Sequence, residues 1–268
     1  MLERIIAAVA ESKKYAAIDP AVTRRVCTES MKKYPKWKDA VKAAKNELHI
    51  MHESFLTDGG YSAANALLEK GLPDAEACRS LLMLHASTRE RAEYADAVCE
   101  MVSHYYTEQD ALCDVGCGFN PFSLPLYPVQ PAAYSAYDIS RDSVGLLNRY
   151  FSMLGKADYR AEILDAVTDI PAPCDLMLAY KILPLLEQQK KGRAMAFLAD
   201  AAFSRAVISF PLKTLSGRER GMEAHYSAFF EEQLPDGIRI LQRKIIGNEL
   251  FYFIEKTTFI KQQVESRK

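Results

Sequence analysis

The chain has 268 residues, of which 49% are hydrophobic and 26% are charged, and its formal net charge at pH 7 is −1. This length is enough for one large α/β domain with a smaller attached unit, and this composition excludes a wholly disordered chain. No apolar run approaches the roughly 20 residues of a membrane span. The N-terminus lacks the pattern of a secretion signal, so we expect a cytoplasmic protein with no membrane partner.

The six cysteines are scattered, with no Cys-x-x-Cys pair and no histidine nearby at the spacing of metal ligands. Cysteines in this arrangement are typical of reduced, mostly buried thiols in a cytosolic protein. We therefore expect no metal site.

The small net charge hides an uneven distribution. Residues 1–48 contain eleven Lys or Arg and six Asp or Glu, an excess of five positive charges. A basic surface at one end of a protein suits the binding of a phosphate backbone. Helices with solvated charged faces would give the same count, so charge alone leaves both interpretations open.

Residues 1–105 contain only helical signals. Asp19-Pro20 is an N-cap residue followed by a proline at the first helical position, and Asp58-Gly59-Gly60 interrupts the helical pattern. We expect a helical N-terminal domain with helices over 21–34, 35–55, 62–70 and 73–83, and a last helix, capped by Ser87 or Thr88, that reaches residue 105.

The most informative segment is residues 111–121, in which an apolar run ends in Asp114 and is followed by Gly116 and Gly118. Glycines there let a nucleotide-like ligand approach the backbone at the end of a buried strand. Pro121 stands where a dinucleotide-binding loop has its third glycine, so a pyrophosphate fits poorly. The pattern favours the first loop of an S-adenosylmethionine (SAM) enzyme, with a plain strand-to-loop turn as the alternative.

From residue 111 strands and helices alternate, which is typical of a doubly wound parallel sheet. A final hairpin over 239–246 and 249–256 argues against a nicotinamide-binding fold, which more often ends in a sixth parallel strand. The predicted fold class is α/β: a Rossmann-like class I SAM-dependent methyltransferase with a seven-stranded sheet and an antiparallel last strand, plus the N-terminal helical domain. We expect strands over 111–115, 133–137, 159–163, 176–179 and 206–210, and helices over 142–154, 184–202 and 222–233.

Two acids follow predicted strands, at the edge where ligands bind in such sheets. Asp138 ends the second strand, 22 residues after Gly116, where a carboxylate would accept hydrogen bonds from both ribose hydroxyls. Asp165 follows the third strand, where it would accept a hydrogen bond from the adenine amino group. The alternatives are a helix cap at Asp138 and a solvated loop acid at Asp165.

Two further groups of residues are candidates for the remaining parts of the site. Arg89 and Arg91 lie at the domain junction, where a guanidinium would hold the carboxylate of the methionine moiety, unless both are exposed helix charges. After the fourth strand, Lys181 suits an approaching phosphate, and the apolar run 183–186 would shape the pocket wall.

Phe210 ends the fifth predicted strand and precedes a basic loop with Lys213, Arg218 and Arg220. In one interpretation Phe210 stacks on a flipped base while the cations hold phosphates. In the other, this is only a flexible charged loop.

Four ordered motifs resemble the aminoglycoside-resistance 16S ribosomal RNA methyltransferases, and the resemblance runs from about Ser12 to Glu255. The segments at Glu223 and at residues 246–250 fit the same pattern. The four motifs are His-Ala-Ser-Thr-Arg-Glu-Arg from His85, Gly-Cys-Gly-Phe-Asn-Pro from Gly116, Lys-Ile-Leu-Pro-Leu-Leu-Glu from Lys181, and Ser209-Phe210-Pro211 with Ser216-Gly217-Arg218.

The resemblance implies methylation by SAM of N7 of the guanine at 16S rRNA position 1405, in the decoding A site of the assembled 30S subunit, and thereby aminoglycoside resistance. It also implies that residues 1–105 dock on rRNA, that 106–268 form the SAM-binding catalytic domain, and that Arg91 rather than Arg89 holds the SAM carboxylate. The expected cofactor is SAM, the expected partner is 16S rRNA, and we expect a monomer.

The expected site residues form three groups. Catalytic roles are expected for Phe210 and Lys181. The expected SAM-binding residues are His85, Ser87, Arg91, Asp114, Gly116, Gly118, Asn120, Pro121, Asp138, Ile139, Asp165, Ala166 and Leu183. The expected rRNA-binding residues are Lys13, Lys14, Lys32, Lys33, Lys213, Arg218 and Glu223.

Two other functions stay open from the sequence. A SAM-dependent methyltransferase acting on a small molecule would use the N-terminal helices as a lid. A non-catalytic RNA-binding or ribosome-assembly protein would have no use for the glycine loop, Asp138 or Asp165.

Overall fold

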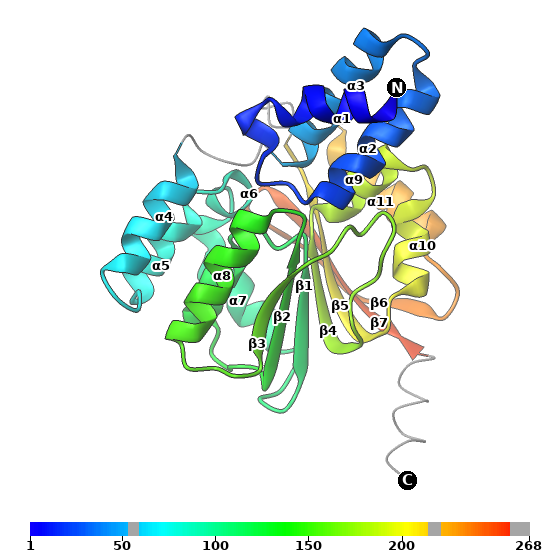
Figure 1. Ribbon diagram of the computed structural model, residues 1–268. Helices are drawn as coiled ribbons and strands as arrows, with labels where there is room; N and C mark the ends of the chain where they lie inside the picture. The colour runs from blue at the N-terminus through cyan, green and yellow to red at the C-terminus, as the bar shows by residue number, and fades with distance from the viewer. Residues whose placement is uncertain (53–58, 214–220, 258–268) are drawn as a thin grey trace.

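A seven-stranded sheet with helices on both faces is the centre of the fold (Figure 1). The computed structural model describes residues 1–52, 59–213 and 221–257. The strands follow the order β3-β2-β1-β4-β5-β7-β6. Strands β1 to β5 are parallel, and β7 runs antiparallel between β5 and β6. This is the sheet that the terminal hairpin predicts.

The bounds of the elements are as follows. The strands are β1 (Ala111–Val115), β2 (Ala133–Asp138), β3 (Tyr159–Ile163), β4 (Cys174–Tyr180), β5 (Phe203–Pro211), β6 (Ile238–Ile246) and β7 (Glu249–Lys256). The helices are α1 (Leu2–Ala10), α2 (Pro20–Lys33), α3 (Trp37–Met51), α4 (Gly60–Glu69), α5 (Ala75–Leu82), α6 (Ala86–Arg89), α7 (Ala95–Ser103), α8 (Arg141–Met153), α9 (Ile182–Gln189), α10 (Arg193–Asp200) and α11 (Met222–Gln233).

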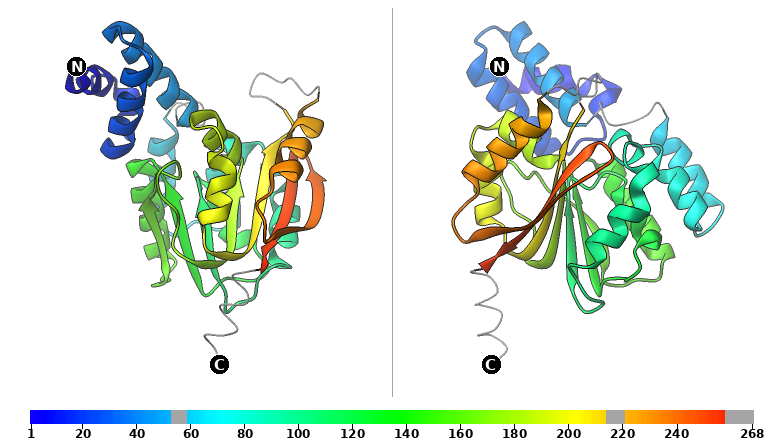
Figure 2. Two further views of the ribbon diagram at one scale, coloured as in Figure 1. Left: turned by 90° about the vertical axis from the view of Figure 1, so that its right-hand side faces the viewer. Right: turned by 180° about the vertical axis from the view of Figure 1, so that it is seen from behind.

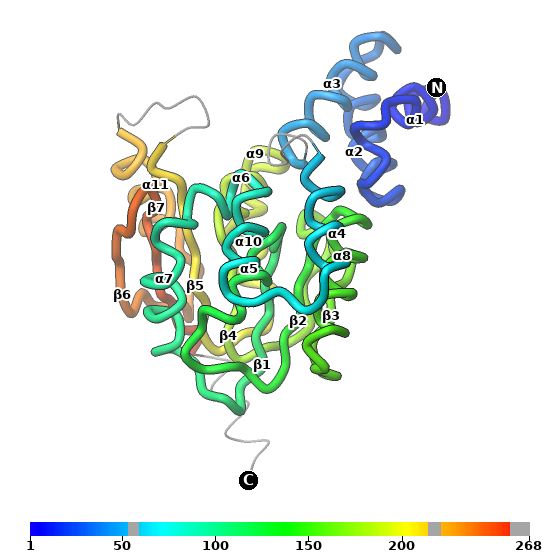
Figure 3. The backbone as a smooth tube through the Cα atoms, turned by 90° about the vertical axis from the view of Figure 1, so that its left-hand side faces the viewer, coloured from blue at the N-terminus to red at the C-terminus, as the bar shows by residue number. Residues whose placement is uncertain are grey.

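Each face of the sheet has its own hydrophobic core, because side chains alternate across a strand. On one face Leu112 and Tyr134 pack with side chains of α4, α5, α7 and α8. On the other face Val115 and Met177 pack with α9, α10 and α11. The left view in Figure 2 has the second group in front of the sheet, and Figure 3 is seen from the side of the first group.

Helices α1, α2 and α3 form a unit with a separate core, in which Ile5, Val26 and Leu48 are buried. The unit sits over the ends of β2 and β3, above the sheet in Figure 1. Ile18 forms an isolated backbone bridge with Ser140, directly after β2. We call α1–α3 the N-terminal unit.

The other helices before residue 105 pack differently from the N-terminal unit. Helices α4, α5 and α7 bury their apolar side chains in the core of the sheet. The expected helical N-terminal domain therefore contains two groups of helices that pack separately. The expected boundary at residue 105, between an rRNA-docking domain and a catalytic domain, stays a prediction.

Most predicted elements are confirmed, with each predicted strand found within three residues at either end. The single helix predicted over 184–202 is wrong, because α9 and α10 are separate. Gly192 adopts φ +78° between them, a left-handed conformation that glycine takes without steric penalty. Its N–H donates to the Glu187 carboxylate at 2.8 Å.

The predicted cap at Ser87 or Thr88 is also wrong, and no continuous helix runs from there to residue 105. A short helix, α6, ends at Arg89, and α7 begins only at Ala95. The Thr88 hydroxyl instead donates to the backbone oxygen of Leu82 at 2.5 Å. It thereby fixes the turn that brings Ser87 to the edge of the sheet.

All six cysteines are buried and free of disulfide bonds, as expected, and the Cys174 thiol donates a hydrogen bond to Sγ of Cys113 at 3.0 Å. Within the described ranges no helix combines the length and the apolar character needed to cross a membrane.

Candidate active site

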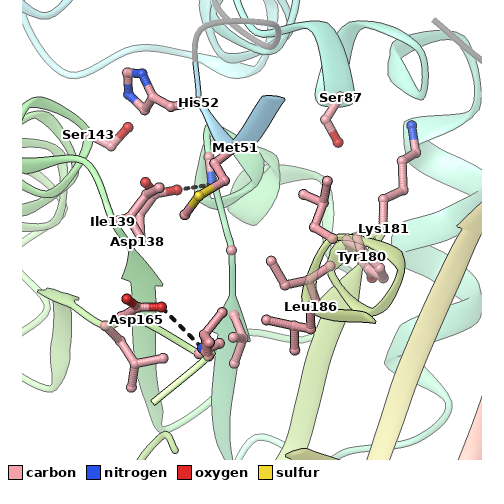
Figure 4. Close-up of a pocket in the computed structure, with 18 of the residues that line it drawn as sticks. Met51, His52, Ser87, Asp138, Ile139, Ser143, Asp165, Tyr180, Lys181 and Leu186 are labelled. Atoms are coloured by element: carbon pink, nitrogen blue, oxygen red, sulfur yellow. Dashed lines mark hydrogen bonds between the residues drawn. The ribbon is translucent and has the colours of Figure 1, made fainter. Parts of the chain in front are cut away.

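A cavity of about 810 Å³, counted with its open mouth, lies at the carboxyl ends of β1, β2, β3 and β4. The position is where open α/β sheets bind their ligands. Figure 4 shows Asp138 and Asp165 on one side of the cavity and Tyr180, Lys181 and Leu186 on the other.

The loop that contains Gly116 and Gly118 contributes backbone rather than side chains to the cavity wall at these two positions. Gly116 and Gly118 adopt φ +66° and +49°. A Cβ on Gly118 would lie 2.7 Å from Cε1 of His85, and one on Gly116 would lie 2.9 Å from Cδ1 of Ile182. The backbone conformation therefore favours glycine at both positions, and at Gly118 the His85 ring also leaves no room for a Cβ.

Asp138 is joined to this loop through its carboxylate. Oδ2 accepts a hydrogen bond from the Gly118 N–H at 2.9 Å, and Oδ1 accepts one from the Ser140 N–H at 2.9 Å. Burial raises the pKa of Asp138, and the charge of His52 and the two N–H donors oppose this shift. The predicted position of Asp138 in the cavity wall is thus observed, and it is also bonded to the turn that begins α8.

Asp165 lines the same cavity directly after β3. Its carboxylate accepts hydrogen bonds from Nε of Arg25 at 2.5 Å and from the Val167 N–H at 3.1 Å. Asp165 is only 8% exposed, so it is not a solvated loop acid.

His85 is an uncharged part of the wall. Burial, with the charge of His52 next in size and those of Arg91, Lys181 and Arg89 after it, lowers the pKa of His85 to about 3. Its ring stacks on Phe119, with centroids 5.5 Å apart. The imidazole is therefore neutral at physiological pH.

Of the expected SAM-binding residues, eight line the cavity and five do not. Those that line it are His85, Ser87, Gly116, Gly118, Asp138, Ile139, Asp165 and Ala166. The five others are buried behind the wall, namely Arg91, Asp114, Asn120, Pro121 and Leu183. Their expected direct contact with a ligand is therefore not supported by this placement and stays a prediction.

Asp114 supports the glycine loop from behind. Its Oδ2 accepts hydrogen bonds from Nδ2 of Asn120 at 2.8 Å and from the Tyr134 hydroxyl at 2.8 Å. Burial raises the pKa of Asp114 to about 6, and those two donors act against the shift. Asp114 thus fixes the start of the segment that follows the two glycines.

Arg91 belongs to a buried ionic cluster at the domain junction. Its Nη1 lies 3.2 Å from Oε1 of Glu249, its Nη2 donates to Oδ1 of Asn120 at 3.3 Å, and its guanidinium lies 4.6 Å from the centroid of the Tyr180 ring. Glu249, at the start of β7, is 2% exposed. The carboxylate that holds Arg91 in this structure is therefore a side chain of the protein.

Lys181 joins the same cluster and lines the cavity. Its Nζ lies 2.5 Å from Oε2 of Glu90 and 3.0 Å from Oε1 of Glu249. Two carboxylates contact its ammonium group, which does not fit the expected role of receiving a phosphate. Lys181 also begins α9 in the left-handed region, with φ +57°.

Phe210 does not line the cavity, and the packing of its ring argues against the predicted stacking on a flipped base, which stays a prediction. The ring is fully buried. It stacks on Tyr226, with centroids 5.0 Å apart, and contacts Phe230 and Tyr252 at 5.3 and 6.0 Å. Phe210 packs α11 against the sheet.

The expected rRNA-binding residues within the described ranges do not line the cavity. Lys13, Lys14, Lys32 and Lys33 are exposed on the N-terminal unit, and Lys213 is exposed after β5. Glu223 on α11 accepts a hydrogen bond from Nη2 of Arg243. Arg218 and Arg220 lie outside the described residues. These rRNA contacts stay predictions.

Sequence reasoning missed several wall residues from outside the sheet. Met51 and His52 come from the end of α3, Tyr61 from α4 and Gln189 from α9. The Tyr61 hydroxyl lies 2.7 Å from the hydroxyls of both Ser140 and Ser143. No local motif marks these residues, because only the packing of α3 and α4 over the sheet brings them to the site.

No group of three or more His, Cys, Asp or Glu side chains suited to a metal ion occurs in the part of the chain that the structure describes.

Comparison with known proteins gives the family. The family model described as ribosomal RNA methyltransferase (FmrO) matches residues 11–253. The chain belongs to this family. The resemblance carried by the four sequence motifs is confirmed.

This rRNA methyltransferase is similar to characterised relatives over nearly its whole length. It is 36% identical to a 16S rRNA (guanine(1405)-N(7))-methyltransferase of Serratia marcescens, over 94% of this chain and 97% of the relative. It is 30% identical to one of Micromonospora echinospora, over 95% and 97% of the two chains.

Solved structures agree with this similarity. The crystal structure of the 16S rRNA methyltransferase RmtF in complex with S-adenosyl-L-homocysteine (SAH) has a TM-score of 0.88 and 37% identity, over 96% of this chain and 98% of that one. The structure of the 16S rRNA methylase RmtB has a TM-score of 0.82 and 31% identity, over 96% and 98%.

The first prediction concerns the support of the loop by Asp114. The folded protein holds the Asp114 proton up to a pKa of about 6, whereas an unperturbed aspartate has a pKa of 3.8, so the free energy of unfolding falls as pH rises between about 4 and 6. In Asp114→Asn this contribution is absent, and the difference between variant and parent should change by about 3 kcal/mol across that window. Urea denaturation at several pH values measures it, and a pH-independent difference would contradict it.

The second prediction concerns the glycine loop. Gly118→Ala should weaken SAH binding more than tenfold, because the new Cβ meets the His85 ring and strains the backbone. Gly145→Ala on α8 is the matched control, since nothing lies within 4 Å of the added Cβ. It should bind SAH like the parent and gain up to about 1 kcal/mol of stability. Calorimetric titration with SAH measures the affinity, and equal affinity in the two variants would contradict the prediction.

The third prediction separates packing from substrate contact at Phe210. Phe210→Leu should lower the free energy of unfolding by about 1–3 kcal/mol, because a fully buried ring loses contacts. The KM for the RNA substrate should stay as in the parent. Unchanged stability with a selective loss of RNA turnover would restore the stacking role.

Proposed function

We propose that this rRNA methyltransferase transfers the methyl group of SAM to N7 of the guanine at position 1405 of 16S rRNA, in the decoding A site of the assembled 30S subunit, and so confers aminoglycoside resistance. The observation that carries the proposal is the convergence of the glycine loop, Asp138 and Asp165 on one cavity at the carboxyl ends of the strands. The proposal includes action in the cytoplasm, as a monomer.

The residues of the cavity fit SAM. Gly116 and Gly118 leave room for a ligand to approach the backbone. The carboxylates of Asp138 and Asp165 would hold the ribose and the adenine amino group. His85, being neutral, adds no positive charge beside a cationic sulfonium. When bound, SAM supplies an electrophilic methyl group.

The chemistry needs little from the protein beyond orientation. Guanine N7 has an in-plane lone pair, so no proton has to leave before methyl transfer and no general base is required. The chain's contribution is to hold N7 in line with the methyl group and to exclude water from the cavity. The charge-balanced cluster of Arg91, Lys181, Glu90 and Glu249 fits a positioning function better than proton transfer.

The N-terminal unit is the part of the chain that we assign to rRNA docking. Its exposed lysines at 13, 14, 32 and 33 lie on a segment with an excess of five positive charges. Phosphate contacts of this kind position a protein on RNA without reading the sequence. The unit sits over the same edge of the sheet as the cavity (Figure 1), so a docked RNA would lie close to the site.

A single assay tests the reaction, the substrate and the position. The parent is incubated with tritiated SAM and either 30S subunits or naked 16S rRNA, and borohydride–aniline cleavage then locates 7-methylguanine. We expect label on 30S subunits with a break at guanine 1405. Asp138→Ala should lose both SAH binding and label, since it removes a wall carboxylate.

The alternatives give different results in the same assay. Binding of SAH without label on any RNA would favour a small-molecule methyltransferase. Binding of 30S subunits without any binding of SAH would favour a non-catalytic RNA-binding protein.

A further inference from the structure

One arginine of the N-terminal unit bonds to two residues of the cavity wall. Arg25 lies on α2, and its side chain is 11% exposed. Its Nε lies 2.5 Å from Oδ2 of Asp165, and its Nη2 lies 3.2 Å from Oδ1 of the same carboxylate. Nη2 also donates to Oε1 of Gln189 on α9 at 2.8 Å. Arg25 therefore links two residues of the cavity wall to α2, a helix that lies far before the sheet in the sequence.

The hydrogen bonds of Asp165 account for most of its acceptor capacity. A carboxylate has about four lone-pair positions. Three are used by Nε and Nη2 of Arg25 and by the Val167 N–H. The two-pronged contact with a planar guanidinium also fixes the rotation of the carboxylate. One acceptor position is left, which suits a single N–H donor in the cavity.

The attachment of α2 makes this contact well defined. The backbone N–H of Asp19, the cap of α2, donates to the oxygen of Ile139 at 2.9 Å, and the N–H of Arg141 donates to the oxygen of Ala17 at 2.7 Å. These bonds follow β2, while Arg25 bonds to Asp165 after β3. The N-terminal unit is thus anchored at the ends of both strands that carry the cavity's acids.

We propose that Arg25 is a positioning residue for cofactor binding. It orients Asp165 and Gln189 so that this end of the cavity accepts a hydrogen bond from the adenine amino group of SAM. The N-terminal unit is then a part of the cofactor site as well as an RNA-docking surface. This inference rests on the proposed function, in which Asp165 faces the adenine.

A plain structural salt bridge would have different consequences. It would stabilise the attachment of the unit, so its loss would lower the melting temperature or raise the KM for 30S subunits. A positioning role predicts a change specific to the cofactor. The KM for SAM should rise about tenfold in Arg25→Gln, the effect of one or two charge-assisted hydrogen bonds. The kcat and the KM for 30S subunits should stay within about twofold.

The direct experiment is calorimetric titration of the full-length protein with SAH. Arg25→Gln should bind SAH about tenfold more weakly than the parent, and Arg25→Lys, which keeps the charge but not the planar fork, should be intermediate. Arg24→Ala is the matched control on the same helix, since Arg24 is exposed and pairs with Glu3 away from the cavity. Its affinity for SAH should equal that of the parent.

The outcomes separate this inference from the proposed function. If the parent itself fails to bind SAH, the proposed function fails. If the parent binds SAH and Arg25→Gln binds it equally well, the positioning role alone is overturned. If Arg25→Gln does not fold, Arg25→Lys decides: parental SAH affinity overturns the role, and a selective loss of SAH affinity with an unchanged KM for 30S subunits supports it.

Discussion

The hydrogen bond from the Gly118 N–H to the Asp138 carboxylate is the contact on which the site depends. It joins the loop after β1 to the end of β2, and it needs a glycine because the φ of +49° and the adjacent His85 ring exclude a side chain. The same carboxylate accepts the Ser140 N–H at the start of α8. One buried acid thereby sets the loop, the strand end and the following helix in a common geometry.

The opposite wall depends on a different kind of constraint. Arg91, Lys181 and Glu249 bury their charges together, and a buried charge is tolerated only when it is paired and hydrogen-bonded. Glu249 begins β7, so this cluster ties the terminal hairpin to the helices before the sheet and to the start of α9. The antiparallel end of the sheet is therefore connected to the cavity electrostatically, although it contributes no residue to the wall.

Local sequence patterns predict much of the sheet and about half of the residues that line the site. Apolar runs predict the strands, and parallel strands bring their carboxyl ends to one edge, so Asp138 and Asp165 meet in the cavity as expected. Arg91 and Phe210 could not be assigned in this way. The partner of Arg91 lies 158 residues further along the chain, and the burial of Phe210 depends on α11 packing over β5 and β7. Asp114 is a different case, because strand alternation directs it to the face opposite Val115.

The contribution of the N-terminal unit to the cavity is the feature that local sequence patterns predict least well. Its charge indicates a surface for phosphates, and that interpretation treats the unit as separate from catalysis. The contacts of Arg25, and the position of Met51 and His52 in the wall, instead make the unit a side of the cavity. In the proposed function α2 docks on RNA while its Arg25 also holds a carboxylate of the cavity wall, so the helix serves two tasks. In such an arrangement the basic surface and the cavity are parts of one structure, because α2 carries exposed lysines and also Arg25, which bonds to the cavity wall.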